Sequence, residues 1–430
     1  MVARPPLSLP VLGTMLCTAF WAGCAPEASR QAPSSPDLSS PDLSTETEVA
    51  FLDPPAGPGA LAANWQVGDS VALSWLEPAD QGHLFKVSEL QGETWTEPRE
   101  IAGGSGFFAN WADLPGTVAD DRGHAFAHWL QKLGDGTYAY GVQQAHRDTA
   151  GAWQGAGLLH EDASPQEHGF VSYAPLPGGG VQAFWLDGGQ MGSAGHGADH
   201  DGADDASGHG SAGSMELRTR LLGGDDKGPE TVLDPRVCEC CATDAAWTAA
   251  GPLVVFRDRS EDEIRDIYVV RRQGETWTEP RPVHQDGWQI NGCPVNGPAV
   301  GSDGETVAVA WFTAAPTPRV QVAFSRDAGA TFDGPVVIDD QWPIGRVDLA
   351  MAENGDAVVA WMGTGDAGAD IRWRRLRSDG TITAQGVAAP TTEKRSSGVT
   401  RMRLDGDRLL FAWIHDDGPQ RLRVGAVRLP

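Results

Sequence analysis

Basic residues are scarce in this chain of 430 residues, which has 32 lysines and arginines against 58 aspartates and glutamates. The formal net charge of -26 argues against a nucleic-acid partner, because a polyanion would be repelled. Beyond the N-terminal region no run of about 18 apolar residues occurs, so the sequence predicts no further membrane span. Tyrosine and cysteine are also rare, with four and six residues, so each of them can be followed individually.

Glycine, proline and tryptophan are abundant instead, with 54, 30 and 16 residues. This turn-rich composition is typical of short strands and argues against a helical bundle. Hydrophobic residues make up 40% of the chain, which is enough for a sizeable core.

The first 23 residues have the organisation of an export signal. A single charge, Arg4, precedes an apolar run from Leu7 to Phe20, and small residues stand before Cys24. This pattern resembles a bacterial lipoprotein signal, and the resemblance implies that Cys24 becomes the lipidated first residue of the mature protein. An ordinary secretory signal cut nearby is the alternative. Either way we expect an exported protein, and the lipoprotein interpretation places it in a bacterial cell envelope, attached to the membrane by its lipid anchor only.

Residues 24–47 are rich in proline, serine and alanine and contain the segment SPDLS twice in succession. They have too few apolar side chains to fold, so we expect a disordered, extended spacer. The folded domain is therefore expected over residues 48–430.

An apolar run that ends in an aromatic residue recurs through this domain. It ends in Ala-x-Trp or a variant at seven positions: Trp75, Trp129, Trp185, Phe256, Trp311, Trp361 and Trp413. Successive positions are 50 to 56 residues apart, except for a spacing of 71 between the third and the fourth. Each run follows a Gly-centred turn and precedes a polar loop and another alternating strand, which gives four short strands per repeat.

Repeats of this length with four antiparallel strands are typical of a β-propeller. We therefore predict an all-β fold of seven four-stranded blades, or of six if a weak unit such as that around Trp361 packs irregularly. The last repeat ends at Pro430 after three strands. We expect residues 48–52 to supply the missing outer strand and to close the ring.

One segment, residues 325–332 with the sequence SRDAGATF, fits the Asp-box pattern of sialidases. Two others, 91–99 and 273–281, share the sequence QGETWTEPR at the corresponding place in their repeats. On these segments the chain resembles bacterial sialidase-like propellers with BNR (Asp-box) repeats, over about residues 48–430.

The resemblance implies a structural turn. In such a box Ser325 and Asp327 bond nearby backbone N–H groups, Gly329 adopts a positive φ, and Phe332 packs between sheets. It says little about chemistry, because the same box occurs in many propellers that hydrolyse nothing.

Four cysteines remain in the domain: Cys238, Cys240, Cys241 and Cys293. With strands labelled a to d from the axis outward, a blade has its d-to-a and b-to-c connections on one face, where ligands normally bind. All four cysteines map to d-to-a connections, before the fourth and the fifth blade. We therefore expect them to meet at one rim.

The long spacing marks an insertion, residues 188–214, between strands b and c of the third blade. It is rich in glycine, alanine, aspartate and histidine, and its imidazoles at His196, His200 and His209 are good ligands for first-row metals. One hypothesis is therefore a copper or zinc site in which two or more of the four cysteines provide thiolates and His196, His200 or His209 captures or delivers the ion. The alternative is two disulfides, which an exported protein readily forms, an inert insertion and no cofactor.

A hydrolase of the sialidase type is the alternative function. The resemblance implies an arginine cluster, a Tyr–Glu pair and an acidic residue, but the Phe-Arg-Ile-Pro motif is absent and Phe256-Arg257-Asp258-Arg259 is the nearest string. Tyr173, on an inner strand after His168, is the best placed tyrosine, and Arg346 and Arg401 are further candidates near the axis. We expect His128 to be a hydrogen-bonded interior residue.

We therefore expect a monomeric, exported propeller that binds a metal ion or an envelope glycan or protein through the cysteine rim. Arg257, Asp258, Tyr173 and His168 are the candidate ligand-binding residues. Enzyme activity is left open, and the same rim could also serve as a protein-interaction platform.

Overall fold

The computed structural model describes residues 48–429 apart from 149, 192–212, 224–225, 366–367 and 417. All described strands belong to one compact unit, Leu43–Pro430. Its single described helix is a 3-10 turn, η1 (Arg395–Ser397), so no helix in the described part of the chain is long and apolar enough to cross a membrane.

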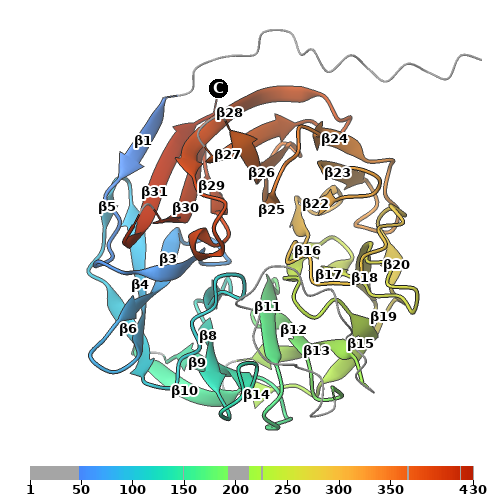
Figure 1. The fold of residues 1–430 in the computed structure, drawn as a ribbon. Helices are drawn as coiled ribbons and strands as arrows, with labels where there is room; N and C mark the ends of the chain where they lie inside the picture. The colour runs from blue at the N-terminus through green and yellow to red at the C-terminus, as the bar shows by residue number, and fades with distance from the viewer. Residues whose placement is uncertain are drawn as a thin grey trace, which may run out of the picture. The chain divides into compact units, whose positions relative to one another are not determined.

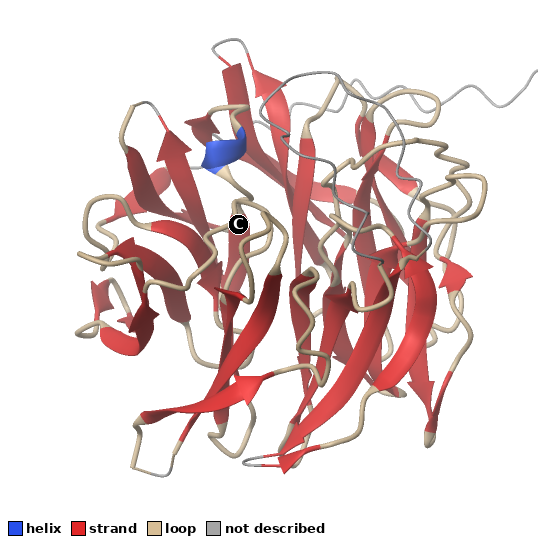
Figure 2. Ribbon diagram, turned by 60° about the horizontal axis from the view of Figure 1, so that its bottom comes forward, coloured by secondary structure: helices blue, strands red, loops and turns tan. Residues whose placement is uncertain are grey.

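Seven antiparallel sheets are arranged around a central axis (Figure 1), and strands make up nearly all of the regular structure (Figure 2). The strands of the first three blades are β2 (Leu61–Trp65), β3 (Ala72–Pro78), β4 (His83–Gln91), β5 (Thr94–Trp95) and β6 (Arg99–Gly104); β7 (Gly116–Ala119), β8 (Ala125–Lys132), β9 (Tyr140–Arg147) and β10 (Trp153–Leu158); and β11 (His168–Pro175), β12 (Val181–Asp187), β13 (Met215–Gly223), β14 (Asp226–Lys227) and β15 (Thr231–Val237).

The remaining four blades continue in chain order. Their strands are β16 (Asp244–Thr248), β17 (Gly251–Arg257), β18 (Ile267–Gln273), β19 (Thr276–Trp277) and β20 (Arg281–Pro282); β21 (Ala299–Ser302), β22 (Val307–Thr313), β23 (Arg319–Ser325) and β24 (Val336–Asp339); β25 (Gly345–Met351), β26 (Ala357–Gly365), β27 (Gly368–Leu376) and β28 (Ile382–Thr391); and β29 (Arg401–Asp405), β30 (Arg408–Asp416), β31 (Gln420–Arg428) and β1 (Val49–Leu52).

The prediction of a seven-bladed propeller is confirmed, and the six-bladed alternative is wrong. The unit around Trp361 is a regular blade of four strands, because β26 pairs with β25 and β27 along its length. The N-terminal strand β1 pairs antiparallel with β31, with Val49 opposite Val427, so the first and last strands of the domain share one sheet. Figure 1 shows these two strands side by side.

A hydrogen bond to a carboxylate lets four of the blades bury a tryptophan on the second strand. In four blades the buried indole N–H donates to a carboxylate: Trp75 to Glu77, Trp185 to Asp187, Trp311 to Asp286 and Trp361 to Asp339. The ring fills the space between sheets, and its only polar atom is paired, as buried donors require.

Side chains also fasten neighbouring inner strands to one another. Asp113 accepts the backbone N–H of Phe170 at 2.9 Å, Asp244 that of Val300 at 2.8 Å, and Asp348 that of Met402 at 2.6 Å. The aspartate of each pair precedes or lies in one blade, and its partner lies in the next blade. We call these hydrogen bonds the inter-blade clasps.

The Trp–carboxylate pairs predict a measurable loss of stability. Trp311→Phe should lower the free energy of unfolding by about 1–3 kcal/mol more than Trp373→Phe, because only Trp311 has a bonded indole N–H. Both rings are almost fully buried, so the second variant controls for lost volume. Urea unfolding followed by tryptophan fluorescence measures both, and equal losses would contradict a role for the Asp286 bond.

Candidate functional site

Two adjoining cavities lie at the axis and on the face that carries the d-to-a and b-to-c connections, which we call the upper face. The channel cavity, about 90 Å³, is lined by inner strands and the segments that lead into them, from all seven blades. The aromatic cavity, about 370 Å³, lies among the loops of blades 1, 2 and 7. Leu114 and Val399 line both, so the two cavities are contiguous.

The channel cavity contains polar atoms that are buried and have no hydrogen-bond partner. Apart from Nε of Arg401, which lies 3.4 Å from Oδ2 of Asp348, these are Oη of Tyr173, Nδ1 of His128, Oδ2 of Asp113 and Oγ1 of Thr117 among its lining residues. More than nine in ten buried polar groups in proteins are paired, so four unpaired atoms in one small cavity are unusual.

His128 is held in a defined orientation. Its Nε2 lies 3.1 Å from the carbonyl oxygen of Leu114, to which it donates, and Nδ1 therefore carries a free lone pair. Burial lowers the pKa of His128 to about 4, so the imidazole is neutral at pH 7. Its ring meets the edge of Tyr173 with centroids 5.3 Å apart, and burial raises the pKa of this phenol, which keeps it protonated.

Two buried acids, Asp113 and Glu167, lie close together at the channel cavity, and only Asp113 lines it. Tyr140 donates to Oε1 of Glu167 at 2.5 Å, and the charge of Glu167 acts on Asp113. Burial raises the pKa of Glu167 to about 7 and that of Asp113 well above its usual range. Gly169 leaves room for this arrangement, since a Cβ there would lie 1.9 Å from Oδ2 of Asp113.

Two arginines supply positive charge to the channel cavity, Arg346 and Arg401. Arg346 has a φ of 53°, at an irregularity where the register of β25 shifts, and this turns its side chain over the Trp111 ring at 4.8 Å. Its guanidinium donates to the carbonyl oxygen of Gly398 at 2.8 Å, and burial lowers its pKa to about 10. Nε of Arg401 lies 3.4 Å from Oδ2 of Asp348, and the two side chains form an ion pair.

The aromatic cavity combines ring faces with polar groups. Phe108, Trp111, Tyr138 and Trp413 line it together with the polar residues Asn110, Thr137, Ser396 and Gln420. The indole nitrogen of Trp413 is buried without a partner. Apolar ring faces beside a few polar groups are the usual composition of a small-molecule site.

The four cysteines meet at one place, as the blade assignment predicted. They lie before β16 and before β21 and form the disulfides Cys238–Cys241 and Cys240–Cys293. Cys240 also lines the channel cavity, so the cluster adjoins the candidate ligand site. Three of the sulfur atoms lie within 4.8 Å of one another, close enough for a metal site.

The other candidate residues lie in different surroundings. Tyr173 lines the channel cavity, whereas Arg257 and Asp258 do not. The guanidinium of Arg257 is fully buried and donates to the carbonyl oxygens of Asn296, Arg265 and Phe312, which gives it a bridging role between loops. Asp258 is partly buried, and burial raises its pKa to about 7.

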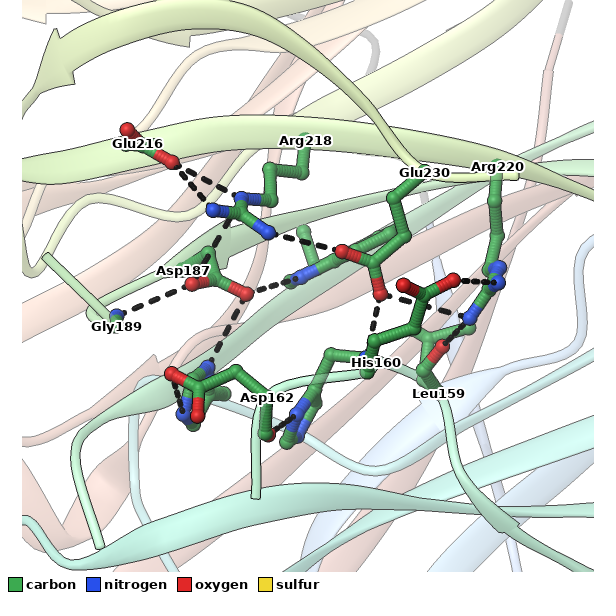
Figure 3. Close-up of polar contacts among 12 residues, drawn as sticks. Leu159, His160, Asp162, Asp187, Gly189, Glu216, Arg218, Arg220 and Glu230 are labelled. Carbon is green, nitrogen blue, oxygen red and sulfur yellow. Dashed lines mark hydrogen bonds and ion pairs between the residues drawn. The ribbon is translucent and has the colours of Figure 1, made fainter. Parts of the chain in front are cut away.

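His168 belongs to a polar network at the top of blade 3. Its Nδ1 lies 3.2 Å from Asp187, and its ring stacks on that of His160 with centroids 4.0 Å apart. Figure 3 shows how Arg218 joins Asp187 to Glu216 and Glu230 in the same network. These contacts place His168 within the wall of the blade, outside the lining of both cavities.

The insertion begins after Asp187 and ends before Met215, at the predicted place between the second and third strands of blade 3. His196, His200 and His209 lie outside the described residues, as does Cys24. The Asp-box turn has the expected bonds: Gly329 N–H donates to Ser325, Thr331 N–H donates to Asp327, and Gly329 has a φ of 77°. Phe332 packs against the core between blades 4 and 5.

Most residues that line the two cavities carry no recognisable signal in the sequence. Asp113, Asp244 and Trp111 lie at blade boundaries where no motif marks them. His128 is hydrogen-bonded, as predicted, but it also faces the channel cavity. Its position directly before the Trp of the repeat could have indicated this, because alternate residues of the strand face opposite sides of the sheet.

No model of a known protein family matches the chain, and no curated protein is similar to it in sequence. Solved structures share its fold at low identity. A polysaccharide lyase is 9% identical with a TM-score of 0.52, covering 87% of this chain and 90% of its own. An ulvan lyase bound to a GlcA-containing sugar unit is 11% identical with a TM-score of 0.51, covering 89% and 94%.

A leech intramolecular trans-sialidase also matches, at 10% identity and a TM-score of 0.43, over 86% of this chain and 68% of its own. The likenesses to the two lyases show a shared propeller fold. The chemistry of this chain has to be argued from its own residues.

The buried acid Glu167 predicts a pH-dependent stability. Burial raises its pKa from 4.5 to about 7, so the folded state binds more protons than the unfolded state in this range. Stability should therefore fall as pH rises from about 4.5 to about 7, by up to roughly 3 kcal/mol from this group. Glu167→Gln should flatten the dependence, measured as free energy of unfolding against pH. Glu275→Gln, in an exposed turn, is the control, and an unchanged slope in Glu167→Gln would contradict the assignment.

Proposed function

We propose that this protein is an exported binding protein that takes a sugar chain of the cell envelope or its surroundings on the upper face. The aromatic cavity would hold a sugar ring, and a substituent would reach into the channel cavity. The export signal and Cys24 anchor predicted from residues 1–24 would display the propeller outside the cytoplasm.

The observation that carries this proposal is the set of unpaired buried polar atoms in the channel cavity. Tyr173, Thr117 and a protonated Asp113 offer hydroxyl-type groups, and His128 offers an acceptor. Sugar hydroxyls both donate and accept hydrogen bonds, so they match such a mixed set. The channel cavity of about 90 Å³ is too small for a pyranose ring, but it has room for one substituent.

The aromatic cavity supplies the complementary half of the site. Its volume of about 370 Å³ is enough for one sugar ring. The faces of Trp111 and Tyr138 suit the C–H faces of a sugar, and Arg346 stacks on Trp111 next to the channel. The net charge of -26 disfavours a densely anionic ligand, so among sugar chains a neutral or sparsely acidic one fits best.

A phenol-to-phenyl substitution separates binding from folding. Tyr173→Phe removes an unpaired buried hydroxyl, so it should leave the fold as stable or more stable, yet weaken sugar binding about tenfold, the equivalent of ~1.4 kcal/mol. Isothermal titration against a panel of neutral, uronate-containing and sialylated oligosaccharides measures this.

Tyr268→Phe, on β18 away from both cavities, is the matched control. Trp111→Ala should weaken binding by loss of the stacking face. If no sugar in the panel binds, or if both tyrosine variants behave alike, the upper face is better explained as a protein-interaction platform.

The pair His128 and Tyr173 favours a second candidate function, cleavage of the bound chain by elimination at a uronate. The uronate ring would lie in the aromatic cavity with C5 and O4 turned toward the channel cavity. There His128 Nδ1 would take the C5 proton, the C4–O4 bond would break as the C4=C5 bond forms, and Tyr173 would give its proton to O4. A neutral imidazole and a protonated phenol are the states that this step needs. Arg346 or Arg401 would bind the uronate carboxylate, since bidentate arginine recognises this group.

A hydrolase of the sialidase type finds less support in the described residues. Tyr173 has no carboxylate partner there, and the Tyr140–Glu167 pair lies outside the lining of both cavities. Of the three candidate arginines, only Arg346 and Arg401 line the channel cavity.

Elimination leaves a spectroscopic signature that hydrolysis does not. Incubation with a uronate-containing polysaccharide should produce the ultraviolet absorbance of an unsaturated uronate. His128→Asn should reduce the rate by about 100-fold or more, the usual contribution of a general base. His124→Asn, in a turn on the opposite face, is the control. New reducing ends without this absorbance would instead indicate hydrolysis.

A further inference from the structure

The four cysteines of the described chain form one compact cluster on the upper face. Cys238 is bonded to Cys241, and Cys240 is bonded to Cys293, which joins the loop before β16 to the loop before β21. The sulfur atoms of Cys238 and Cys240, which belong to different disulfides, are 3.9 Å apart. Two disulfides therefore occupy a single site.

The two bonds differ in what they contribute to the fold. Cys240–Cys293 joins residues 53 apart, whereas Cys238–Cys241 joins residues only three apart. The entropy that a disulfide removes from the unfolded chain grows with the loop it closes, so the short link constrains the unfolded chain less than the long one does. Fastening the two loops needs one disulfide, and the other two sulfurs call for a different explanation.

The spacing of three of the four sulfurs matches a metal site, and the fourth, on Cys293, is bonded to one of them. Four thiolates around a tetrahedral ion at about 2.3 Å lie about 3.8 Å from one another. The distance of 3.9 Å between Cys238 and Cys240 is already close to that value, and Cys241 lies within 4.8 Å of both. Only small side-chain movements would bring these sulfurs to a common ion once the S–S bonds were open.

The surroundings stabilise negative charge on sulfur. Arg265, which is fully buried, points Nη1 at Sγ of Cys238 at 3.4 Å. The same guanidinium is fixed by Glu239 and Glu263, each at 2.9 Å, and Arg259 bonds both glutamates as well. A fixed guanidinium beside a thiol favours the thiolate, which is the form that binds metal.

The cluster is also accessible from one side. Cys238 and Cys241 are buried, whereas Cys293 is exposed and Cys240 borders the channel cavity. A reductant or an ion can therefore approach from the upper face, while the buried side keeps the ligands in place.

We propose that this cluster is a redox-controlled thiolate site for one d10 cation, Zn²⁺ or Cu⁺. Two equivalents of a dithiol reductant would each give two electrons and two protons, opening both disulfides to four thiols while each dithiol closes to its own disulfide. Binding of the ion would then release the thiol protons to water. Thiolates are the preferred ligands of both cations.

Metal titration of the purified full chain tests this. Cys17→Ser and Cys24→Ser are introduced so that only the four cluster cysteines remain. After anaerobic reduction and removal of the dithiol, the chain should bind one Zn²⁺ or one Cu⁺ at least 100-fold more tightly than the oxidised chain. Separate titrations with the two ions show which is preferred, and bound metal should protect the thiols from alkylation.

Variants and a folding control make the outcome decisive. Cys240→Ser and Cys241→Ser should each lose the tight binding, whereas His124→Ala on the opposite face should retain it. A reduced chain that stays folded by circular dichroism and binds no more metal than the oxidised chain would overturn the proposal. If reduction unfolds the chain, refolding by one equivalent of metal would support the site, and failure to refold would overturn it.

Discussion

Closure of the ring is the constraint on which the rest of the structure depends. Seven twisted sheets form a closed ring only if neighbouring blades stay packed together. The inter-blade clasps of Asp113, Asp244 and Asp348 fasten three of the seven junctions, those between blades 2 and 3, 4 and 5, and 6 and 7. The pairing of β1 with β31 completes the ring on the outside. Burying these carboxyl groups is unfavourable for their charged forms, which is why burial raises their pKa values.

The candidate ligand site lies where the inner strands of the closed ring come together at the axis. Where inner strands come together, their upper ends bring polar side chains into a space too narrow for full hydration. Asp113 illustrates this. One oxygen of its carboxyl group accepts the backbone N–H of Phe170 in blade 3, and the other has no hydrogen-bond partner and faces the channel cavity. Asp113 thus both joins two blades and lines the channel cavity. Part of the polarity of the cavity therefore comes from a side chain that also holds the ring together.

The fold could be predicted from the sequence far better than the site could. The Trp repeat is periodic because every blade has to bury the same second strand, and the cysteines could be placed because connections follow from strand order. Tyr173, Arg346 and Arg401 are candidates from the sequence, and all three line the channel cavity. Most of the other lining residues could not be predicted, since residues such as Trp111 and Tyr138 come from loops without a repeat. The left-handed backbone at Arg346, which turns its side chain, leaves no mark in the residue pattern. Arg257 and His168 were predicted to bind the ligand, but both side chains are buried away from the two cavities.

Three residues with left-handed backbone, Ala62, Phe170 and Arg346, stand where the inner strands of blades 1, 3 and 6 lose regular register, and each lines one of the two cavities. A non-glycine residue in this conformation costs about 1 kcal/mol or more. Selection for thermostability alone would therefore favour glycine at these positions and would erase the cavity walls in the same step. Thermal stability and ligand binding therefore make opposite demands on these three positions, and engineered variants of this propeller would have to be screened for both properties.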